Sequence, residues 1–489
     1  MIDNLNSENY NNFILIVAER SKKMKTKVTT LTRRREIGYE AGITTESVVY
    51  NAFYVYFVIF LTNVVGMNPV LAGTVSLISV CVDAITDPLC GWIIDHPRFN
   101  PKTFMLIGGL TTGILLGCTF VVIDASAGAQ FAYYTIVCSL MWCAYTMFCI
   151  PYYSSCAQMT DDYDKLTKIR GISSTMNAFV IYAGCAFPIV FITIFQKGGM
   201  AATTSWTAAM FCIGAISIVF GLINFFSIKD VEFIQKAVEE STDGILKTYA
   251  DVIKLKPMRF FIPFIFFYLF GSAMVSANTN YLIIYVAGAD PNAITKTALV
   301  TMLCFLVGSP VFTWVSTKMD RKAAITLAFG FTLVGVIIMR IHGINSIGTL
   351  YAFTAIAGVA CVGFWVLFYD FSYDLIALDE YKNHKNRAGC ITSFPQLIQK
   401  FGNAVGLQTI GIILSAVGYD ASKTVQSAGT VVGIENISTI YFAICLAVSL
   451  ICILTYPVNR KVYAKLQAAN ERRRNGEYDF VDPDVDHVL

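Results

Sequence analysis

Two carboxylates stand out because they lie in a stretch that is otherwise apolar. The stretch runs from Val75 to Asp95, reads VSLISVCVDAITDPLCGWIID, and carries Asp83 and Asp87 near its middle. Ionisable groups at membrane depth are costly, so they usually face a cavity and mark an ion or substrate pathway. A spacing of four places both carboxylates on one helix face, about 6 Å apart along the axis. Two carboxylates this close share a proton or hold a cation, which predicts a metal-ion (cation) site at Asp83 and Asp87.

The proline that follows the pair leaves a second interpretation open. Pro88 removes a backbone donor, so a local break would expose the carbonyl oxygen of Ala84 or Ile85 as a further ligand. The same proline, with Asp95 just beyond it, also fits a helix cap or a solvated pair at the membrane edge. Both interpretations place the pair in the second helix, and only the first makes it functional.

A positive charge in a later apolar stretch is the natural partner of this pair. Lys400 lies among apolar residues and glycines. An unpaired buried lysine would lose its proton, so a charged Lys400 requires a carboxylate, and Asp83 and Asp87 are the candidates. We therefore predict that Lys400 has a coupling role and pairs with the two aspartates when the cation is absent.

The composition indicates that membrane-spanning helices position these groups. Of the 489 residues, 55% are hydrophobic and 14% are charged, against about 25% charged residues in soluble domains. A helix needs about 17 to 25 apolar residues to cross a bilayer. We predict an all-α integral membrane protein with twelve transmembrane helices at 46–66, 70–95, 103–123, 129–156, 169–196, 205–228, 259–286, 292–317, 323–341, 346–370, 389–418 and 437–457.

The positive charges set the expected orientation, because short loops rich in Lys and Arg stay in the cytoplasm. With the amino end inside, the inner segments hold all of the 36 Lys and Arg residues except Lys197, Lys296, Arg340, Lys400 and Lys423. We expect a multi-pass protein of the cell (inner) membrane with both termini in the cytoplasm. The first ten residues are polar, unlike a signal peptide, and Met24 is a second candidate for the first residue.

Several other functions find no support in the sequence. The 14 cysteines lie in or at the ends of apolar stretches without a CxxC spacing, so we expect small buried side chains rather than disulfides or a thiolate metal site. The sequence has no Walker A motif, so ATP does not drive the protein directly. None of the four histidines lies inside a helix core beside a nucleophile, which argues against a membrane enzyme. We expect no cofactor and no nucleic-acid partner.

A hydrophilic linker divides the chain into two halves. Residues 229–258 separate a six-helix bundle at 46–228 from a second one at 259–457, with a basic tail at 1–45 and another tail at 458–489. The charged turn DHPRFNPK after the second helix has a counterpart, KMDRK, after the eighth. Corresponding turns in two six-helix halves are typical of a transporter built from two parallel repeats.

Two segments are candidates for the walls and the gate of a path between these halves. Residues 145–153, YTMFCIPYY, combine polar and aromatic groups with a proline, which fits a cavity wall or a packed helix end. The charged loop 160–165 is either a solvated face or an inner gate, where ion pairs between the halves hold one access state closed. The residues that we assign to a cytoplasmic gate are Asp95, Arg98, Asp161, Asp374 and Arg387.

Three separate motifs resemble one known family. They are VDAITDPLCGWIID in the second helix, IPYYSSCAQMTDDYD after the fourth, and DEYKNHKNRAGCITSFPQLIQKFGNAVG leading into the eleventh. They are similar to motifs of the glycoside-pentoside-hexuronide:cation symporters of the major facilitator superfamily, and the resemblance covers all twelve helices. It implies the major facilitator fold and secondary active transport by alternating access.

The resemblance also implies the members of a cation site. In the family, two aspartates and an intervening asparagine of helix 2 bind the cation together with a threonine of helix 4. Asp83, Asp87 and Thr146 match these positions, and Thr86 stands in place of the asparagine. Because a hydroxyl also ligates sodium, we expect Na⁺ as the coupling ion, with H⁺ or Li⁺ as alternatives.

The sugar site of the family matches this sequence less well. Its acidic residues on helices 1 and 4 match Ser47 and Cys149, and its helix 5 arginine falls near Ser173. Carboxylate and arginine groups form bidentate hydrogen bonds with sugar hydroxyls, so their replacement weakens the case for a galactoside. The residues that we assign to the substrate cavity are Ser47, Tyr145, Cys149, Tyr153, Trp365 and Gln396.

The sequence thus predicts a monomeric symporter in the lipid bilayer that couples inward cation movement to uptake of a glycoside or related sugar. One alternative keeps the fold and the cation but exchanges the sugar for an amphipathic non-sugar solute, lipid-like or steroid-like. A second alternative is a solute sensor derived from a transporter, which binds its ligand without moving it. A sensor would show a large signalling domain or a lost cation pair, and the sequence has neither.

Overall fold

The computed structural model describes most of the chain: residues 32–96, 99–231, 233, 244–288, 293–385, 387–420, 423, 425–475, 477 and 480–486. Met24 and Arg98, on which two of the expectations rest, lie outside these residues.

Twelve helical spans among the described residues are long and apolar enough to cross a membrane, which confirms the predicted all-α fold class. The first span comprises α2 and α3, the seventh α10 and η1, and the twelfth α15, η2 and α16, where η1 and η2 are π-helical turns. In chain order the elements are α2 (Arg33–Glu40), α3 (Gly42–Asn63), α4 (Pro69–Ile94), α5 (Pro101–Thr119), α6 (Ala127–Met159), α7 (Tyr163–Lys197), α8 (Ala202–Ile228), α9 (Ile245–Ile253), α10 (Met258–Tyr281), η1 (Leu282–Val286), α11 (Ala293–Lys318), α12 (Arg321–His342), α13 (Ile347–Asn383), α14 (Ala388–Ala416), α15 (Ala428–Asn436), η2 (Ile437–Tyr441), α16 (Phe442–Thr455), α17 (Arg460–Arg474) and α18 (Pro483–Asp486).

Local sequence signals account for several helix starts. Asn100 accepts a hydrogen bond from the backbone of Lys102 at 3.0 Å, and Pro101 occupies the first helical position of α5. Ser346 and Thr349 form a reciprocal capping box at the start of α13. Such caps satisfy backbone N–H groups that have no partner inside the helix, so they define where each span begins.

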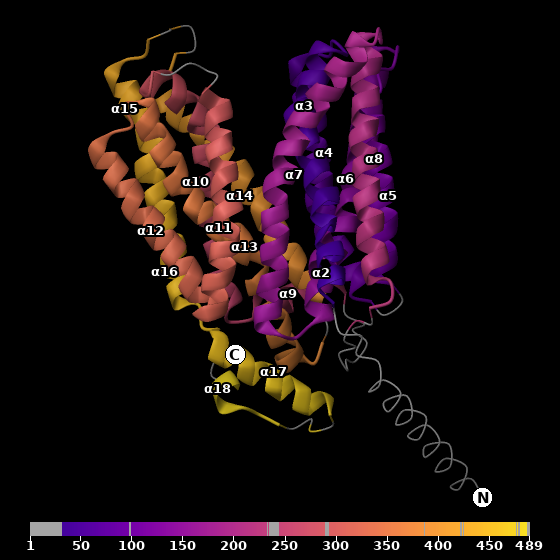
Figure 1. The fold of residues 1–489 in the computed structure, drawn as a ribbon, viewed down its shortest axis with the longest axis vertical. Coiled ribbons are helices and arrows are strands. Elements are labelled where there is room, and N and C mark those ends of the chain that lie inside the picture. Colours follow the sequence, from indigo (N-terminus) through magenta and orange to yellow (C-terminus); the bar gives the residue numbers. More distant parts are fainter. Residues whose placement is uncertain are drawn as a thin grey trace, which may run out of the picture.

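Figure 1 shows the helices in two groups, α3 to α8 and α10 to α16, which converge toward the end where α9, α17 and α18 lie. In the first group α5 packs against α6 and α8, and in the second α10 packs against α14 and α16. Between the groups, α4 packs against α14, and α7 packs against α11 and α13. We call the end of the molecule that carries α9 and α17 the linker side.

Three segments expected to be hydrophilic connections contain helix. The first span begins at Arg33, inside the expected tail 1–45. The expected linker 229–258 holds α9, and the expected tail 458–489 holds α17 and α18. These helices carry many charged or polar residues, so a search for apolar stretches of spanning length does not find them.

Helix α13 is the largest departure from the expected boundaries. The apolar pattern predicts an end at 370, where the first carboxylate of this stretch appears, whereas the helix continues to Asn383. The side chains of Asp370 and Asp379 are completely buried against other parts of the protein. Because these carboxylates find buried cationic partners, the polar sequence remains helical within the packed bundle rather than forming a solvated loop.

Candidate functional site

The two predicted carboxylates meet Lys400 where α4 packs against α14. Nζ of Lys400 lies 2.6 Å from Oδ2 of Asp83 and 2.5 Å from Oδ2 of Asp87. On the other side of the pair, the hydroxyl of Thr146 on α6 lies 2.9 Å from Oδ1 of Asp83 and 2.8 Å from Oδ1 of Asp87. The structure therefore brings together four of the residues assigned to cation binding and coupling.

This cluster is shielded from solvent. The side chains of Asp83 and Asp87 are 3% and 0% exposed, and that of Lys400 is 19% exposed. Buried charges are tolerated when they are paired and hydrogen-bonded. Two ionised carboxylates and one ammonium leave one negative charge in excess, so the arrangement has the charge that one bound monovalent cation would neutralise. Among the described residues, no group of three or more His, Cys, Asp or Glu side chains is placed to hold a metal ion.

Thr86 and Pro88 do not behave as the sequence suggested. The hydroxyl of Thr86 donates to the backbone carbonyl of Asp83 at 3.0 Å, one turn back along α4, rather than pointing at the carboxylates. Helix α4 runs through Pro88 to Ile94 without ending at the proline. In this conformation, the hydroxyl bonded to the carboxylate pair is therefore that of Thr146 and not that of Thr86.

A carboxylate that the sequence interpretation missed lies beside the predicted aromatic residues. The hydroxyl of Tyr145 donates to Oε1 of Glu46 at 2.9 Å. Ser47, the residue matched to the acid of the family, is 3% exposed, and its Oγ accepts a hydrogen bond from Asn51. Consecutive residues of a helix point about 100° apart. Helix α3 is turned so that Glu46, and not Ser47, faces Tyr145.

An arginine of α7 is the second group that was missed. The guanidinium carbon of Arg170 lies 5.0 Å from the ring centre of Tyr153 and 5.2 Å from that of Tyr369. These two rings stack at 3.8 Å and so join α6 to α13. Nη1 of Arg170 pairs with Glu40 at 3.6 Å, but neither Nε nor Nη1 has a hydrogen-bond acceptor among the described atoms. Buried donors are rarely left without an acceptor, so this edge of the guanidinium suits a ligand oxygen.

The other residues assigned to the substrate cavity are distributed differently. Cys149 is 1% exposed on α6, one turn from Tyr145. Gln396 is 7% exposed, and its Nε2 has no partner in the part of the chain that the structure describes. Trp365 packs against Phe364 and Phe368, with ring centres 5.4 and 5.5 Å apart. The α13 ring that stacks on the predicted Tyr153 is Tyr369, one turn after Trp365.

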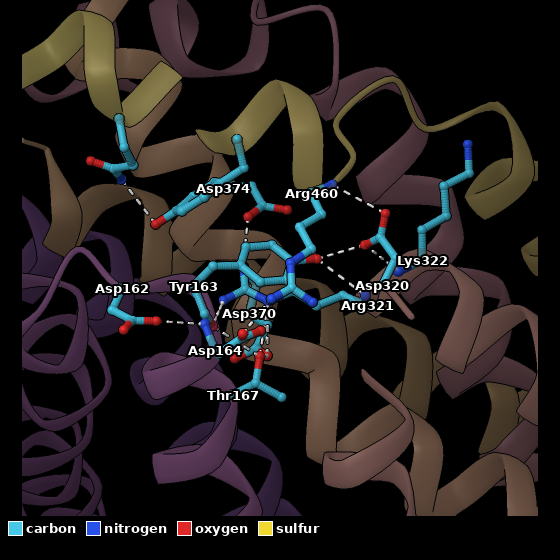
Figure 2. Close-up of polar contacts among 12 residues, drawn as sticks. Asp162, Tyr163, Asp164, Thr167, Asp320, Arg321, Lys322, Asp370, Asp374 and Arg460 are labelled. Carbon is cyan, nitrogen blue, oxygen red and sulfur yellow. Dashed lines mark hydrogen bonds and ion pairs between the residues drawn. The ribbon is translucent and has the colours of Figure 1, made fainter. Parts of the chain in front are cut away.

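An ion-pair network centred on Arg321 joins the two groups at the linker side (Figure 2). Nη1 of Arg321 lies 2.7 Å from Oδ1 of Asp374, and Nε lies 3.2 Å from Oδ2 of Asp370. Its Nη2 donates to the carbonyl oxygen of Tyr163 at 2.7 Å, and the guanidinium lies 3.5 Å from the centre of that ring. Arg321 begins α12 and Tyr163 begins α7, so the network spans both halves of the chain.

Helix α17 adds two further links between the halves. Arg460 pairs with Asp164, which Figure 2 also shows. Nη1 of Arg474 lies 2.8 Å from Asp161, while its Nε and Nη2 bind the two oxygens of Glu380 at 2.6 and 2.7 Å. A bidentate guanidinium is a strong and directional anchor. The expected carboxyl-terminal tail is thus part of the contact between the halves.

Asp95 and Arg387 contribute in different ways. The oxygens of Asp95 accept hydrogen bonds from the backbone N–H groups of Gly389 and Cys390, at 2.7 and 2.8 Å, where α14 begins. Burial raises the pKa of the Asp95 carboxyl to about 7. Arg387 instead pairs with Asp379, a residue of its own half. Asp95 therefore joins α4 to α14, whereas the strongest pair of Arg387 does not cross between the groups.

Comparison with known proteins identifies the family of the chain. Residues 38–460 match the family described as MFS/sugar transport protein. The chain belongs to this family. Among relatives of the family, the chain is 26% identical over 432 residues to the provisionally named glycoside/cation symporter YagG of Escherichia coli (strain K12), covering 86% of this chain and 89% of that protein. It is 24% identical over 440 residues to the isoprimeverose transporter of Lactiplantibacillus pentosus, covering 87% and 89%.

Solved structures confirm the fold of this family member. The crystal structure of the major facilitator transporter FucP in the outward conformation superposes with a TM-score of 0.65 at 13% identity, covering 87% of this chain and 98% of that one. The predicted major facilitator fold and the resemblance to glycoside-pentoside-hexuronide:cation symporters are both confirmed. The chain is a membrane transporter and not an enzyme.

Proposed function

We propose that this family member is a cation-coupled symporter of a glycoside or related sugar. It works by alternating access in the cell (inner) membrane, with both termini in the cytoplasm and Na⁺ as the coupling ion. The observation that carries the proposal is the position of Lys400, whose ammonium from the second half is held by Asp83 and Asp87 of the first. A cation that binds the same carboxylates must change this contact between the halves.

The expected orientation makes the linker side the cytoplasmic side, because the basic connections lie there. The contacts around Arg321, Arg474 and Asp95 then hold the cytoplasmic end closed. Solute and cation enter from outside in this state. Release into the cytoplasm requires these contacts to break, which is the second half of the transport cycle.

Coupling follows from the charge of the site. Without a cation, the two carboxylates hold the ammonium of Lys400 and keep one negative charge in excess. A bound Na⁺ supplies the missing positive charge, weakens the hold on Lys400, and takes an oxygen ligand from Thr146. Rotation of the Thr86 side chain adds a further hydroxyl. Cation and solute drive the cycle only through different affinities for the two access states.

The polar side chains of Glu46, Arg170 and Gln396 support a sugar rather than an amphipathic non-sugar solute. Glu46 supplies a carboxylate, and Arg170 and Gln396 have donors without partners among the described atoms. Sugar hydroxyls satisfy such groups, whereas a lipid-like solute leaves them unpaired at a cost of about 1–3 kcal/mol each. The stacked rings of Tyr153 and Tyr369 add a flat apolar surface. A relative named as an isoprimeverose transporter also supports a glycoside.

The test is uptake of a radiolabelled sugar panel into membrane vesicles under sodium, lithium or proton gradients. The wild type is compared with Asp87→Asn and with Asp124→Asn, an exposed aspartate outside the spans. We expect one sugar to accumulate with sodium, Asp87→Asn to abolish this accumulation, and Asp124→Asn to leave it intact. Ion-driven uptake that survives in Asp87→Asn contradicts the cation site. Solute binding without accumulation under any gradient favours a sensor.

A further inference from the structure

Helix α9 of the linker inserts one tyrosine between the two groups of helices. The hydroxyl of Tyr249 lies 2.9 Å from the carbonyl oxygen of Pro88 on α4 and 2.6 Å from Oγ of Ser393 on α14. A phenol has one proton to donate. Because the carbonyl of Pro88 can only accept, Tyr249 donates to Pro88. The hydroxyl of Ser393 also lies 2.8 Å from the carbonyl oxygen of Cys390, so its one proton is shared between Tyr249 and that carbonyl. One hydroxyl therefore links the two halves of the transporter.

Helix α9 also contacts the second group of helices, so its hydrogen bond to Pro88 is the contact that reaches the first group. The ring of Tyr249 packs 5.0 Å from that of Phe394 on α14. Nη1 of Arg387, next to the start of α14, reaches the carbonyl oxygen of Thr248 at 3.5 Å. When α4 and α14 separate, α9 is expected to stay with α14, and the hydrogen bond to Pro88 is the one that breaks.

The crossing bond lies next to the cation site. Pro88 directly follows Asp87, and its missing N–H makes this turn of α4 a weak point in the helix. One turn further, Gly91 and Gly389 let the two backbones approach closely: a Cβ added at Gly91 would lie 2.7 Å from the carbonyl oxygen of Gly389 and 3.0 Å from the Tyr249 hydroxyl. Tyr249 therefore reaches Pro88 only where α4 and α14 cross this closely.

We propose that α9 is a clip for the closed linker side, with Tyr249 as the positioning residue that holds α4 against α14 beside Asp87. The proposal rests on the proposed alternating access, which requires the linker side to open and close. The clip acts through one hydroxyl, so its loss shifts the balance between the two access states without removing any group that binds cation or sugar.

A native thiol beside the Tyr249 and Asp95 side chains reports this opening. Cys390 is fully buried at the start of α14, where its backbone N–H is bonded to Asp95, the residue that follows α4. The measurement is the rate at which a water-soluble maleimide labels Cys390 in purified protein in lipid nanodiscs without sodium, with Cys390→Ser as the background. One hydrogen bond changes an equilibrium by about two- to tenfold. We expect Tyr249→Phe to label Cys390 faster by this factor.

Partner and control variants separate the clip from general loosening. Ser393→Ala removes a hydrogen-bond partner of the Tyr249 hydroxyl, so we expect it to accelerate labelling too, and the double variant to label no faster than Tyr249→Phe alone. Tyr133→Phe removes a hydroxyl that bonds to the carbonyl oxygen of Cys118 within the first group, at 2.9 Å, and should label as the wild type does. Unchanged labelling in Tyr249→Phe, or equal acceleration in Tyr133→Phe, contradicts the proposal that Tyr249 holds α4 against α14.

The same samples distinguish failure of the clip from failure of the proposed symport. Adding sodium to the wild type tests whether the cation shifts the access equilibrium at all. A wild-type labelling rate that sodium does not change counts against sodium coupling. The rates of the variants without sodium still test the role of Tyr249 as a clip. Faster labelling in Tyr249→Phe together with sodium-driven uptake by the wild type supports both.

Discussion

Nζ of Lys400 lies 2.5 Å from Oδ2 of Asp87, although the two residues belong to different halves of the chain, 313 positions apart. The contact places the single buried ammonium of α14 on the carboxylate pair of α4. It also makes Lys400 a competitor for any cation that uses the same carboxylates. The same contact therefore neutralises part of the charge of the site and holds α4 against α14.

Replacing Lys400 should tighten cation binding and slow transport. In Lys400→Gln, two carboxylates face each other without an ammonium, so a sodium ion no longer competes for them. We expect the apparent sodium affinity at pH 8 to rise by about tenfold, which corresponds to about 1.4 kcal/mol. Isothermal titration calorimetry measures this, and Lys423→Gln, an exposed lysine, is the control. Unchanged or weaker sodium binding in Lys400→Gln would show that the ammonium does not compete.

Removing the guanidinium at the centre of the linker-side network should open that side. Arg321→Gln leaves Asp370 and Asp374 buried without their cation, and breaking a buried pair in this way costs about 3–5 kcal/mol. We expect Cys390 to become readily labelled and sugar accumulation to collapse. Lys318→Gln, an exposed lysine near the end of α11, should behave as the wild type. Full accumulation by Arg321→Gln contradicts the role of the network as a gate.

The crossing of α4 and α14 should not tolerate a side chain at Gly389. A Cβ there would lie 2.5 Å from the carbonyl oxygen of Gly91 and 2.5 Å from a side-chain carbon of Ile94. Overpacking of this kind costs about 1–3 kcal/mol, which lowers the ratio of closed to open protein by about 5- to 150-fold. We therefore expect Gly389→Ala to label faster at Cys390 and to transport slowly. Gly411→Ala on the same helix meets open space and is the matched control; equal effects of the two variants exclude a specific crossing.

Closure of the linker side should depend on pH through Asp95. Burial raises the pKa of this carboxyl to about 7, while the negative charge of Asp379 acts in the same direction and the N–H groups of Gly389 and Cys390 oppose it. An exposed aspartate has a pKa near 3.9. The closed state therefore binds the proton more tightly than the open one, so acidification from pH 7 toward pH 4 favours closure and pH above 7 disfavours it.

The measurement is the open fraction, obtained as the Cys390 labelling rate corrected for the pH dependence of the reagent with an exposed thiol. We expect it to fall as the pH is lowered through 7. Asp95→Asn has no titrating group at this position and should show a flatter profile. A profile of the same slope in Asp95→Asn assigns the pH dependence to another group.

Glu46 should set the affinity for the sugar and leave cation binding alone. A hydrogen bond to a charged group is worth about 1.5–3 kcal/mol, so Glu46→Gln is expected to raise the KM for the sugar by about ten- to a hundredfold. Sodium binding measured by calorimetry should not change. Ser47→Ala, one position along α3, is the control and should keep the wild-type KM. The reverse result would restore Ser47 as the substrate residue.

Hydropathy and short spacings were sufficient to predict most of the architecture. Twelve apolar stretches gave the number of spans because a bilayer demands helices of spanning length, whatever their partners are. The spacing of four between Asp83 and Asp87 put both carboxylates on one face, and a buried Lys400 required an acidic partner. These properties are local, or follow from the cost of burying a charge, so they can be inferred without knowing which helices touch.

The tertiary structure decided which side chains face one another. Whether Glu46 or Ser47 faces Tyr145 depends on the rotation of α3 within its bundle, and that rotation is set by packing against helices distant in sequence. Arg321 and Arg474 became part of the linker-side contact only because α7, α13 and α17 meet there. The length of α13 depends on the same kind of contact. Asp370 stays buried within this helix because Arg321 of α12 neutralises its carboxylate.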